Sequence, residues 1–175
     1  MQDLERTFME FFENTIKQLS VIKHIKSFTI KSDDEADGYS KYPINCEKLI
    51  IQNAKIPENF GNATIINVVS AKDVDFNRDW RNIKKLEINS SLGVNFADMP
   101  ILEEGISGGK WGDVSKFTTK ELLTKLNGPK WVEEHLREEN GKIIVDTDID
   151  LSNRGLTSLP NDFDKVETSG EINLK

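Results

Sequence analysis

The stretch "VDTDIDLSNRGLTSLPNDF", from Val145 to Phe163, contains the pattern that decides the fold prediction. Two of its apolar residues stand two apart, as side chains on one face of a strand do. A third follows five residues later and a fourth precedes a proline; the four are Ile149, Leu151, Leu156 and Leu159. A strand followed by a turn that runs back beneath it cannot bury its apolar side alone, so the sequence predicts neighbouring units of the same kind.

Composition and charge limit the classes of protein. The chain has 175 residues, of which 37% are apolar and 30% charged, and this is enough apolar material for a core. The net charge of −7 argues against nucleic acid as the main partner, because phosphate binding needs a basic surface. No apolar run of about 18 residues and no signal-peptide pattern is found, so no membrane partner is expected. Cys46 is the only cysteine, which excludes an internal disulfide and favours a reducing, cytoplasmic compartment.

Residues 1–26 are predicted to form an amphipathic N-terminal helix. Its apolar side chains recur at steps of three and four residues: Leu4, Phe8, Phe11, Phe12, Ile16, Leu19 and Ile22. An apolar stripe with three phenylalanines must be buried against another surface. We expect the helix to pack on its own domain or, in an alternative reading, to mediate oligomerisation.

Residues 27–98 are predicted to be a degenerate, repeat-like β region. Four segments have apolar residues two apart, as strands with one buried face do: 27–32, 48–53, 64–70 and 85–91. Their first inward positions recur at a spacing of about 20 residues, and units of this length with one short strand each are typical of a parallel solenoid. These positions are Phe28, Leu49, Ile66 and Leu86. An α+β domain with evenly spaced strands is the alternative.

Residues 99–142 are predicted to be a loop followed by a pair of helices that caps the next repeat. Glycines and charges in 99–117 indicate a loop or linker. Thr118 or Thr119 is expected to cap the first helix, with Glu121 in capping-box register, and "NGP" (127–129) ends it. The second helix is predicted over 130–140 and stops at Gly141.

The motif "DLSNRGLTSLP" resembles that of the leucine-rich-repeat proteins, in the short-repeat form common in bacterial and bacteriophage proteins. The resemblance covers residues 143–175 clearly and 27–94 weakly. In that family an asparagine follows the strand, but Arg154 occupies its place here and Asn153 comes one position early. The segment "LIIQNAKIPENF" (49–60) shares the displaced asparagine, at Asn53. Ile172 and Leu174 repeat the Ile149 and Leu151 alternation one repeat length later and are predicted to form an edge strand, either of a longer repeat protein or of a short form that pairs this strand with a partner.

The sequence predicts no catalytic residue, no metal site and no cofactor. "GISGGKWGDVS" (105–115) has only three residues between Gly105 and Gly109 and a tryptophan in the place of the hydroxyl residue, so it does not match a phosphate-binding loop. The acidic runs 32–37 and 146–150 do not match the twelve-residue calcium loop. Neither His24 nor His135 has a metal-ligand or triad neighbour at a useful spacing.

The predicted fold is an α+β or α/β repeat: N-terminal helix, parallel β-solenoid strands, a helical pair, and a further leucine-rich repeat over 143–175, complete or truncated. We expect a non-enzymatic adaptor for a protein partner or for self-association, encoded by a bacteriophage and acting in the bacterial cytoplasm on a host or phage protein. The alternative is a structural, virion-associated component of a phage particle, and an enzyme with an unrecognised site is third. The candidate partner-binding positions point outward between the buried ones: Ile50, Gln52, Asn67, Val69, Glu87, Asn89, Asp150 and Ser152.

Overall fold

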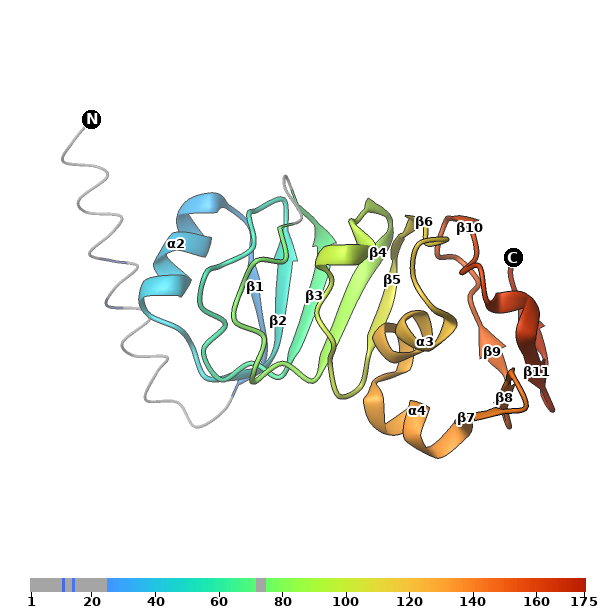
Figure 1. The fold of residues 1–175 in the computed structure, drawn as a ribbon. Helices are drawn as coiled ribbons and strands as arrows, with labels where there is room; N and C mark the ends of the chain where they lie inside the picture. The colour runs from blue at the N-terminus through green and yellow to red at the C-terminus, as the bar shows by residue number, and fades with distance from the viewer. Residues whose placement is uncertain (1–10, 12–13, 15–24, 72–74) are drawn as a thin grey trace. The chain divides into compact units, whose positions relative to one another are not determined.

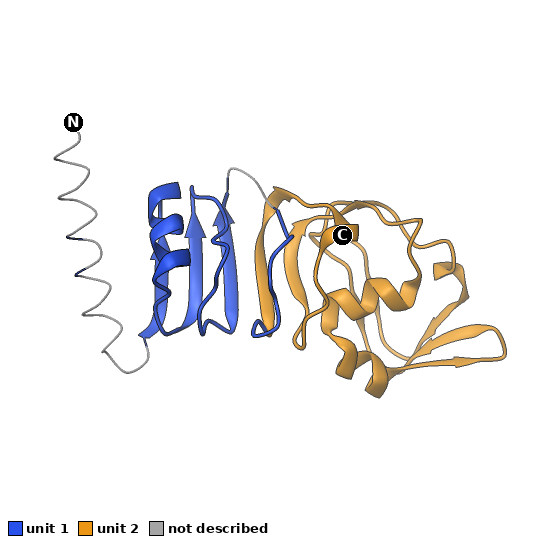
Figure 2. Ribbon diagram, turned by 60° about the vertical axis from the view of Figure 1, so that its left-hand side comes forward, with its two compact units in different colours: residues 1–83 blue, residues 84–175 orange. Residues whose placement is uncertain are grey.

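A computed structural model describes Phe11, Asn14, and residues 25–71 and 75–175, which form a mixed α/β fold with parallel strands and, in these residues, three α-helices (Figure 1). The chain divides into two compact units, residues 1–83 and 84–175 (Figure 2). The helix predicted over residues 1–26 lies almost wholly outside the described residues. No helix in the described part is long and apolar enough to cross a membrane.

The described residues of unit 1 form three parallel strands and one helix: β1 (Ile25–Ile30), α2 (Asp33–Lys41), β2 (Cys46–Gln52) and β3 (Ile65–Ser70). Strand β2 lies between β1 and β3, and Leu49 is the register partner of Phe28 on one side and of Ile66 on the other. The predicted inward positions of the three strands are therefore paired with one another. Leu49, Ile51, Ile66 and Val68 are fully buried, as the alternation predicted.

Helix α2 lies between the predicted strands 27–32 and 48–53, where the sequence predicts no helix. Ser32 caps the helix by accepting from the Glu35 N–H, and acidic residues fill the first turn, where the helix dipole favours negative charge. The acidic run 32–37 is thus a helix start. Tyr39 is buried, and its ring stacks on Phe28 at 5.7 Å between centroids, so the helix packs on the inner side of β1.

The connections after β2 and β3 contain the same turn. The Ala63 N–H donates to the Phe60 carbonyl at 3.1 Å, and the Ile83 N–H donates to the Trp80 carbonyl at 2.9 Å. The residue before Phe60 and the residue before Trp80 also play the same role, since each accepts from the N–H two positions later. The Asn59 side chain accepts from the Gly61 N–H, and the Asp79 side chain accepts from the Arg81 N–H.

Unit 2 begins with β4 (Lys85–Gly93), the short helix η1 (Phe96–Asp98), β5 (Ile106–Lys110) and β6 (Gly112–Asp113). Strand β5 pairs with β4 in parallel, so the prediction of a loop over 99–117 was wrong for this part. Gly108 has a φ of 75°, and a Cβ there would lie 1.7 Å from the Ile88 carbonyl oxygen. The strand therefore requires a glycine, which hid its periodicity in the sequence.

The helical pair of unit 2 consists of α3 (Thr119–Asn127) and α4 (Pro129–His135). Thr118 and Glu121 form the predicted capping box at the start of α3. The second helix was predicted to continue to residue 140, but it ends at His135. Strand β7 (Leu136–Glu139) follows and pairs antiparallel with β8 (Lys142–Val145). Asn140 and Gly141 have φ values of 54° and 76°, which is the geometry of a two-residue hairpin turn.

The C-terminal part of unit 2 contains β9 (Ile149–Asp150), β10 (Leu156–Ser158), the short helix η2 (Phe163–Lys165), β11 (Val166–Thr168) and β12 (Ile172–Asn173). Three further parallel pairs form here, β8 with β11, β9 with β12 and β6 with β10. Ile172 is the register partner of Ile149, as the repeated alternation predicted. Ile149 and Leu151 are buried.

Candidate partner-binding surfaces

The outward positions of unit 1 lie in rows across its parallel strands. Thr29, Ile50 and Asn67 are register partners, and all three are half-buried. Beyond this row, Gln52 and Val69 are exposed, and Val69 has 37% of its surface accessible. The pairing shifts after Ile51, so Gln52 is the register partner of Ser70 and not of Val69. All of these outward residues are uncharged, in a chain of which 30% of the residues are charged, and Lys48 is the charged residue on the same face.

The outward positions of unit 2 are polar. Glu87 is the register partner of Ser107, and its carboxylate lies 3.5 Å from the Lys85 ammonium. The carboxylate of Asp150 accepts from the Ser152 N–H, and hydrogen bonding from the Ser152 side chain and backbone lowers the pKa of Asp150. The carbonyl side chain of Asn89 accepts from Ser91 in the same way. Asn89 and Asp150 therefore accept from residues two positions later, Glu87 pairs with Lys85, and the structure does not gather these side chains into a cleft.

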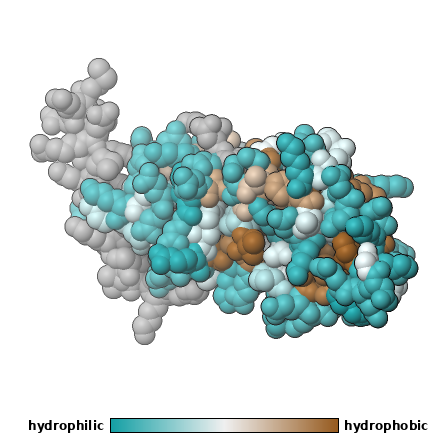
Figure 3. Space-filling model, in the orientation of Figure 1, coloured by the Kyte–Doolittle hydropathy of each residue, from teal (hydrophilic) through white to brown (hydrophobic). Residues whose placement is uncertain are grey.

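The predicted edge strand is paired on one side. The register of β12 with β9 leaves Ile172 and Leu174 exposed, with 40% and 54% of their surfaces accessible. They are two of the few large apolar side chains with high exposure among the described residues. Hydrophilic residues cover most of the face in Figure 3, with apolar side chains visible only in small groups.

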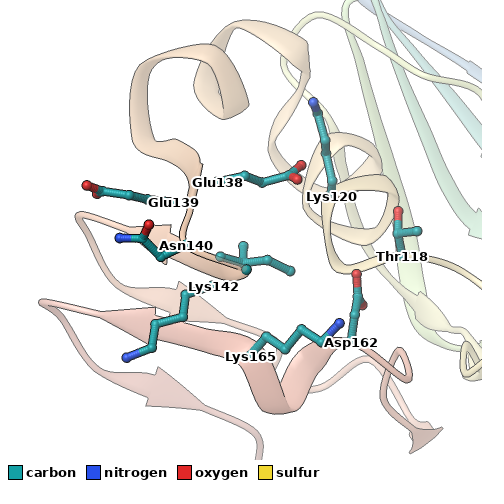
Figure 4. Close-up of a pocket in the computed structure, with 10 residues that line it drawn as sticks. Thr118, Lys120, Glu138, Glu139, Asn140, Lys142, Asp162 and Lys165 are labelled. Carbon is teal, nitrogen blue, oxygen red and sulfur yellow. The ribbon is translucent and has the colours of Figure 1, made fainter.

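A polar pocket of about 440 Å³ lies between the start of α3, the β7–β8 hairpin and η2 (Figure 4). Its charged lining is balanced, with three lysines and three acids: Lys120, Lys142, Lys165, Glu138, Glu139 and Asp162. Asp162 already accepts from the N–H and the hydroxyl of Thr119, both at 2.9 Å. In Figure 4, Glu138 and Lys165 point into the pocket, whereas Glu139 and Lys142 point away. The pocket therefore has no excess of one charge that would select a ligand, and sequence analysis missed it because three distant segments form it.

The single cysteine is part of a buried polar cluster in unit 1. The Tyr39 hydroxyl lies 3.6 Å from the Cys46 sulfur and donates toward the carbonyls of Ile44 and Phe60, both at 3.1 Å. Burial raises the pKa of the Cys46 thiol and raises the pKa of Tyr39 far above its usual value. Because the thiolate is the reactive form, this environment makes Cys46 a structural residue.

A buried and a half-buried cation in unit 2, Lys125 and Arg154, bind backbone carbonyls. The Lys125 ammonium donates to the carbonyls of Phe96 and Met99, at 2.7 and 2.8 Å, and to that of Ala97 at 3.2 Å. The Arg154 guanidinium donates to the Ile106 carbonyl at 3.0 Å and lies 5.0 Å from the Trp111 ring centroid. Both contacts bridge segments of unit 2 and have a structural role.

The described residues contain no group of three or more histidine, cysteine or acidic side chains that could hold a metal ion. His135 is bonded to Asp146 at 2.8 Å and contacts Trp131, while His24 lies outside the described residues. No protein-family model, no curated protein and no solved structure matches the chain.

Proposed function

We propose that the chain is a non-enzymatic protein–protein interaction module that binds a partner protein over the outward face of the parallel strands of unit 1. The uncharged row of Thr29, Ile50 and Asn67, together with the exposed, uncharged side chains of Gln52 and Val69, carries this proposal. The cores of protein interfaces are depleted of charged residues. Lys48, near the start of β2, is the one charged residue among the outward positions of the described strands of unit 1. A sheet face with so little charge, on a chain of which 30% of the residues are charged, therefore fits a surface that a partner covers.

We further propose that the chain is a repeat protein of the leucine-rich type. The parallel strand pairs support this, because their partners lie about 20 residues apart in the chain and each pair needs a connection that runs back beneath the sheet. The shared asparagines add independent support. Asn53 and Asn153 have φ values of 57° and 56°, and the N–H of each donates to the adjoining chain segment.

The biological setting follows from the resemblance of the "DLSNRGLTSLP" motif. On that basis we propose an adaptor encoded by a bacteriophage, with a host or phage protein as its partner. The alternative, a structural component of a phage particle, depends on the N-terminal helix, which lies outside the described residues.

The test is capture of a partner from bacterial lysate, its purification, and measurement of its affinity for three forms of the chain. Val69→Glu places a charge in the uncharged row of unit 1. The matched control is Ile101→Glu, which places the same charge at an apolar residue that is 62% exposed on a loop. A charge buried in an interface core costs at least about tenfold in affinity. We expect this loss for Val69→Glu alone, and equal affinities of the two variants would refute the proposed face.

A further inference from the structure

Asn140 and Gly141 form the turn of the β7–β8 hairpin, and both line the polar pocket (Figure 4). Both residues are exposed, and a Cβ placed on Gly141 would meet no atom within 4 Å. The pair that closes the hairpin is Glu139 with Lys142, so the Gly141 N–H takes no part in the hydrogen bonds between the strands. The Gly141 nitrogen is therefore an accessible backbone group directly after a side-chain amide.

The turn can bring that nitrogen to the Asn140 side chain without moving the strands. The φ values of 54° and 76° are those of a type I′ turn. A flip of the peptide between the two residues gives a type II′ turn, which also fits a two-residue hairpin, and glycine adopts the new φ freely. The flip turns the ψ of Asn140 to about −120°. At this angle the Asn140 Cβ eclipses the Gly141 nitrogen, as a five-membered ring requires.

We propose that Asn140 is a modification site at which the chain deamidates itself. The Gly141 nitrogen gives its proton to hydroxide or a buffer base and forms a bond to the Asn140 Cγ. The Cγ–Nδ2 bond then breaks, and the nitrogen takes a proton from solvent and leaves as ammonia. Water opens the resulting succinimide at Cγ to give aspartate, or at the backbone carbonyl carbon to give isoaspartate. One water thus replaces one ammonia, and no atom is oxidised or reduced.

The modification changes the pocket and the hairpin. A carboxylate replaces a neutral amide, so the charged lining changes from three lysines and three acids to three lysines and four acids. Isoaspartate also inserts a methylene group into the backbone of the turn, whose length fixes the register of β7 with β8. Neither feature belongs to the partner-binding face proposed for unit 1, so this inference goes beyond the proposed function and can fail independently of it.

The sequence contains a second Asn–Gly pair, Asn127 and Gly128, which the fold protects. Asn127 is half-buried at the end of α3, and the Gly128 N–H donates to the Thr124 carbonyl at 2.9 Å. A Cβ on Gly128 would lie 2.0 Å from the Glu103 carbonyl oxygen, so the backbone is tightly packed there. Ring closure at Asn127 would have to break this bond and this packing. The structure therefore predicts that one of two identical dipeptides reacts.

The test is incubation of the folded full chain in mildly alkaline buffer, followed by proteolytic digestion and mass spectrometry with fragmentation that separates aspartate from isoaspartate. We expect both products at position 140, formed at least about tenfold faster than at position 127, because Gly128 must first leave its hydrogen bond. In concentrated urea this protection is lost, and the two rates should become similar.

The variant that tests the nucleophile is Gly141→Ala, whose methyl group crowds the nitrogen and restricts the flip. It should slow the reaction at position 140 by about tenfold or more and leave position 127 unchanged. The matched control is Gly112→Ala, the same change at a φ of 66° with no atom within 4 Å, which should leave both rates unchanged.

Three results would overturn the inference: equal rates at positions 127 and 140 in the folded chain, aspartate without isoaspartate, or a Gly141→Ala rate no lower than that of Gly112→Ala. Thermal unfolding followed by circular dichroism shows whether each variant is folded. If Gly141→Ala unfolds the chain, the rates at the two positions of the unaltered chain decide.

Discussion

Replacement of Lys125 by methionine tests the most connected polar contact of unit 2. The side chain of Lys125 is 9% exposed, and its ammonium lies 4.7 Å from the Phe96 ring centroid in addition to its three carbonyl acceptors. Methionine fills a similar volume but donates no hydrogen bond. The Phe96 carbonyl keeps the Met99 N–H as a donor at 3.3 Å, and Ala97 is exposed to water. The Met99 carbonyl is the acceptor that would be left buried without a donor.

A buried acceptor without a donor costs about 1–3 kcal/mol, and the lost cation–π contact adds about 0.5–1 kcal/mol. Part of this loss is offset, because the ammonium no longer has to be desolvated. We expect Lys125→Met to lower the free energy of unfolding by about 2 kcal/mol, measured by urea denaturation followed by circular dichroism. The control is Lys120→Met, the same change at an exposed lysine of α3, which should change the free energy by less than about 0.5 kcal/mol. Equal losses in the two variants would refute the structural role of Lys125.

The same lysine links stability to pH. Burial lowers the pKa of Lys125 in the folded protein below its usual 10.5, so the unfolded chain binds this proton more tightly. Between the folded and the unfolded pKa the unfolded state therefore carries more protons, and stability rises with pH in that alkaline window. Lys125→Met should remove this contribution, which urea titrations at a series of alkaline pH values would show as a smaller slope than that of Lys120→Met.

Three further predictions concern unit 2. Arg154→Met should cost about 1–2 kcal/mol in urea denaturation, because the Ile106 carbonyl loses its charged donor, and Arg154→Lys should recover part of this loss. Asn153→Ala should cost about 1 kcal/mol more than Asn153→Gly, because its φ is 56°, a geometry that glycine adopts freely and alanine only with strain; equal thermal stabilities of the two variants would contradict this. Hydrogen bonds from Ser158 and Ser115 hold the pKa of Asp113 at about 2, so its contribution to stability is present at neutral pH and is lost as the pH falls through that value. A carboxyl titration by NMR should show the pKa of Asp113 rising towards its usual value in Ser158→Ala.

The strands with alternating apolar residues could be predicted from the sequence. In a parallel sheet with a repeated connection, the spacing between inward residues equals the register offset between neighbouring strands. Phe28, Leu49 and Ile66 show this in unit 1, and Ile149 and Ile172 show it in unit 2. Burial on one face imposes a period of two on the apolar residues of a strand. The positions of the strands and their register can therefore be predicted from the sequence.

Elements that depend on special backbone geometry, and not on apolar periodicity, could not be predicted from the sequence. Strand β5 contains Gly108 and Gly109, both with positive φ, so no alternation marks it. Strand β7 follows α4 without a break in the pattern of charges, and only the Asn140–Gly141 pair signals the hairpin. Helix α2 has a low content of apolar residues, so no apolar periodicity marks it in the sequence.

The candidate site was predictable only in part. Alternation gives the direction of a side chain, but the crowding of its neighbours decides how much of it is exposed. Ile50 and Asn67 point outward in adjacent strands and are still half-buried, whereas Gln52 and Val69 are exposed. The contacts of Lys125 and of the pocket join segments that are distant in the sequence, and no local pattern encodes such pairs.

The departure from the asparagine pattern at Arg154 has a structural reason. Strand β5 pairs with β4, and no strand occupies its other side among the described residues, so its carbonyls need another donor. The Arg154 guanidinium meets this need at the Ile106 carbonyl, and the Arg154 carbonyl accepts from the Trp111 N–H at 2.8 Å. An asparagine side chain is several bonds shorter than an arginine side chain, and it hydrogen-bonds to backbone groups of its own turn. Arg154 therefore bonds to a strand 48 residues earlier in the chain, and it ties the "DLSNRGLTSLP" segment to β5.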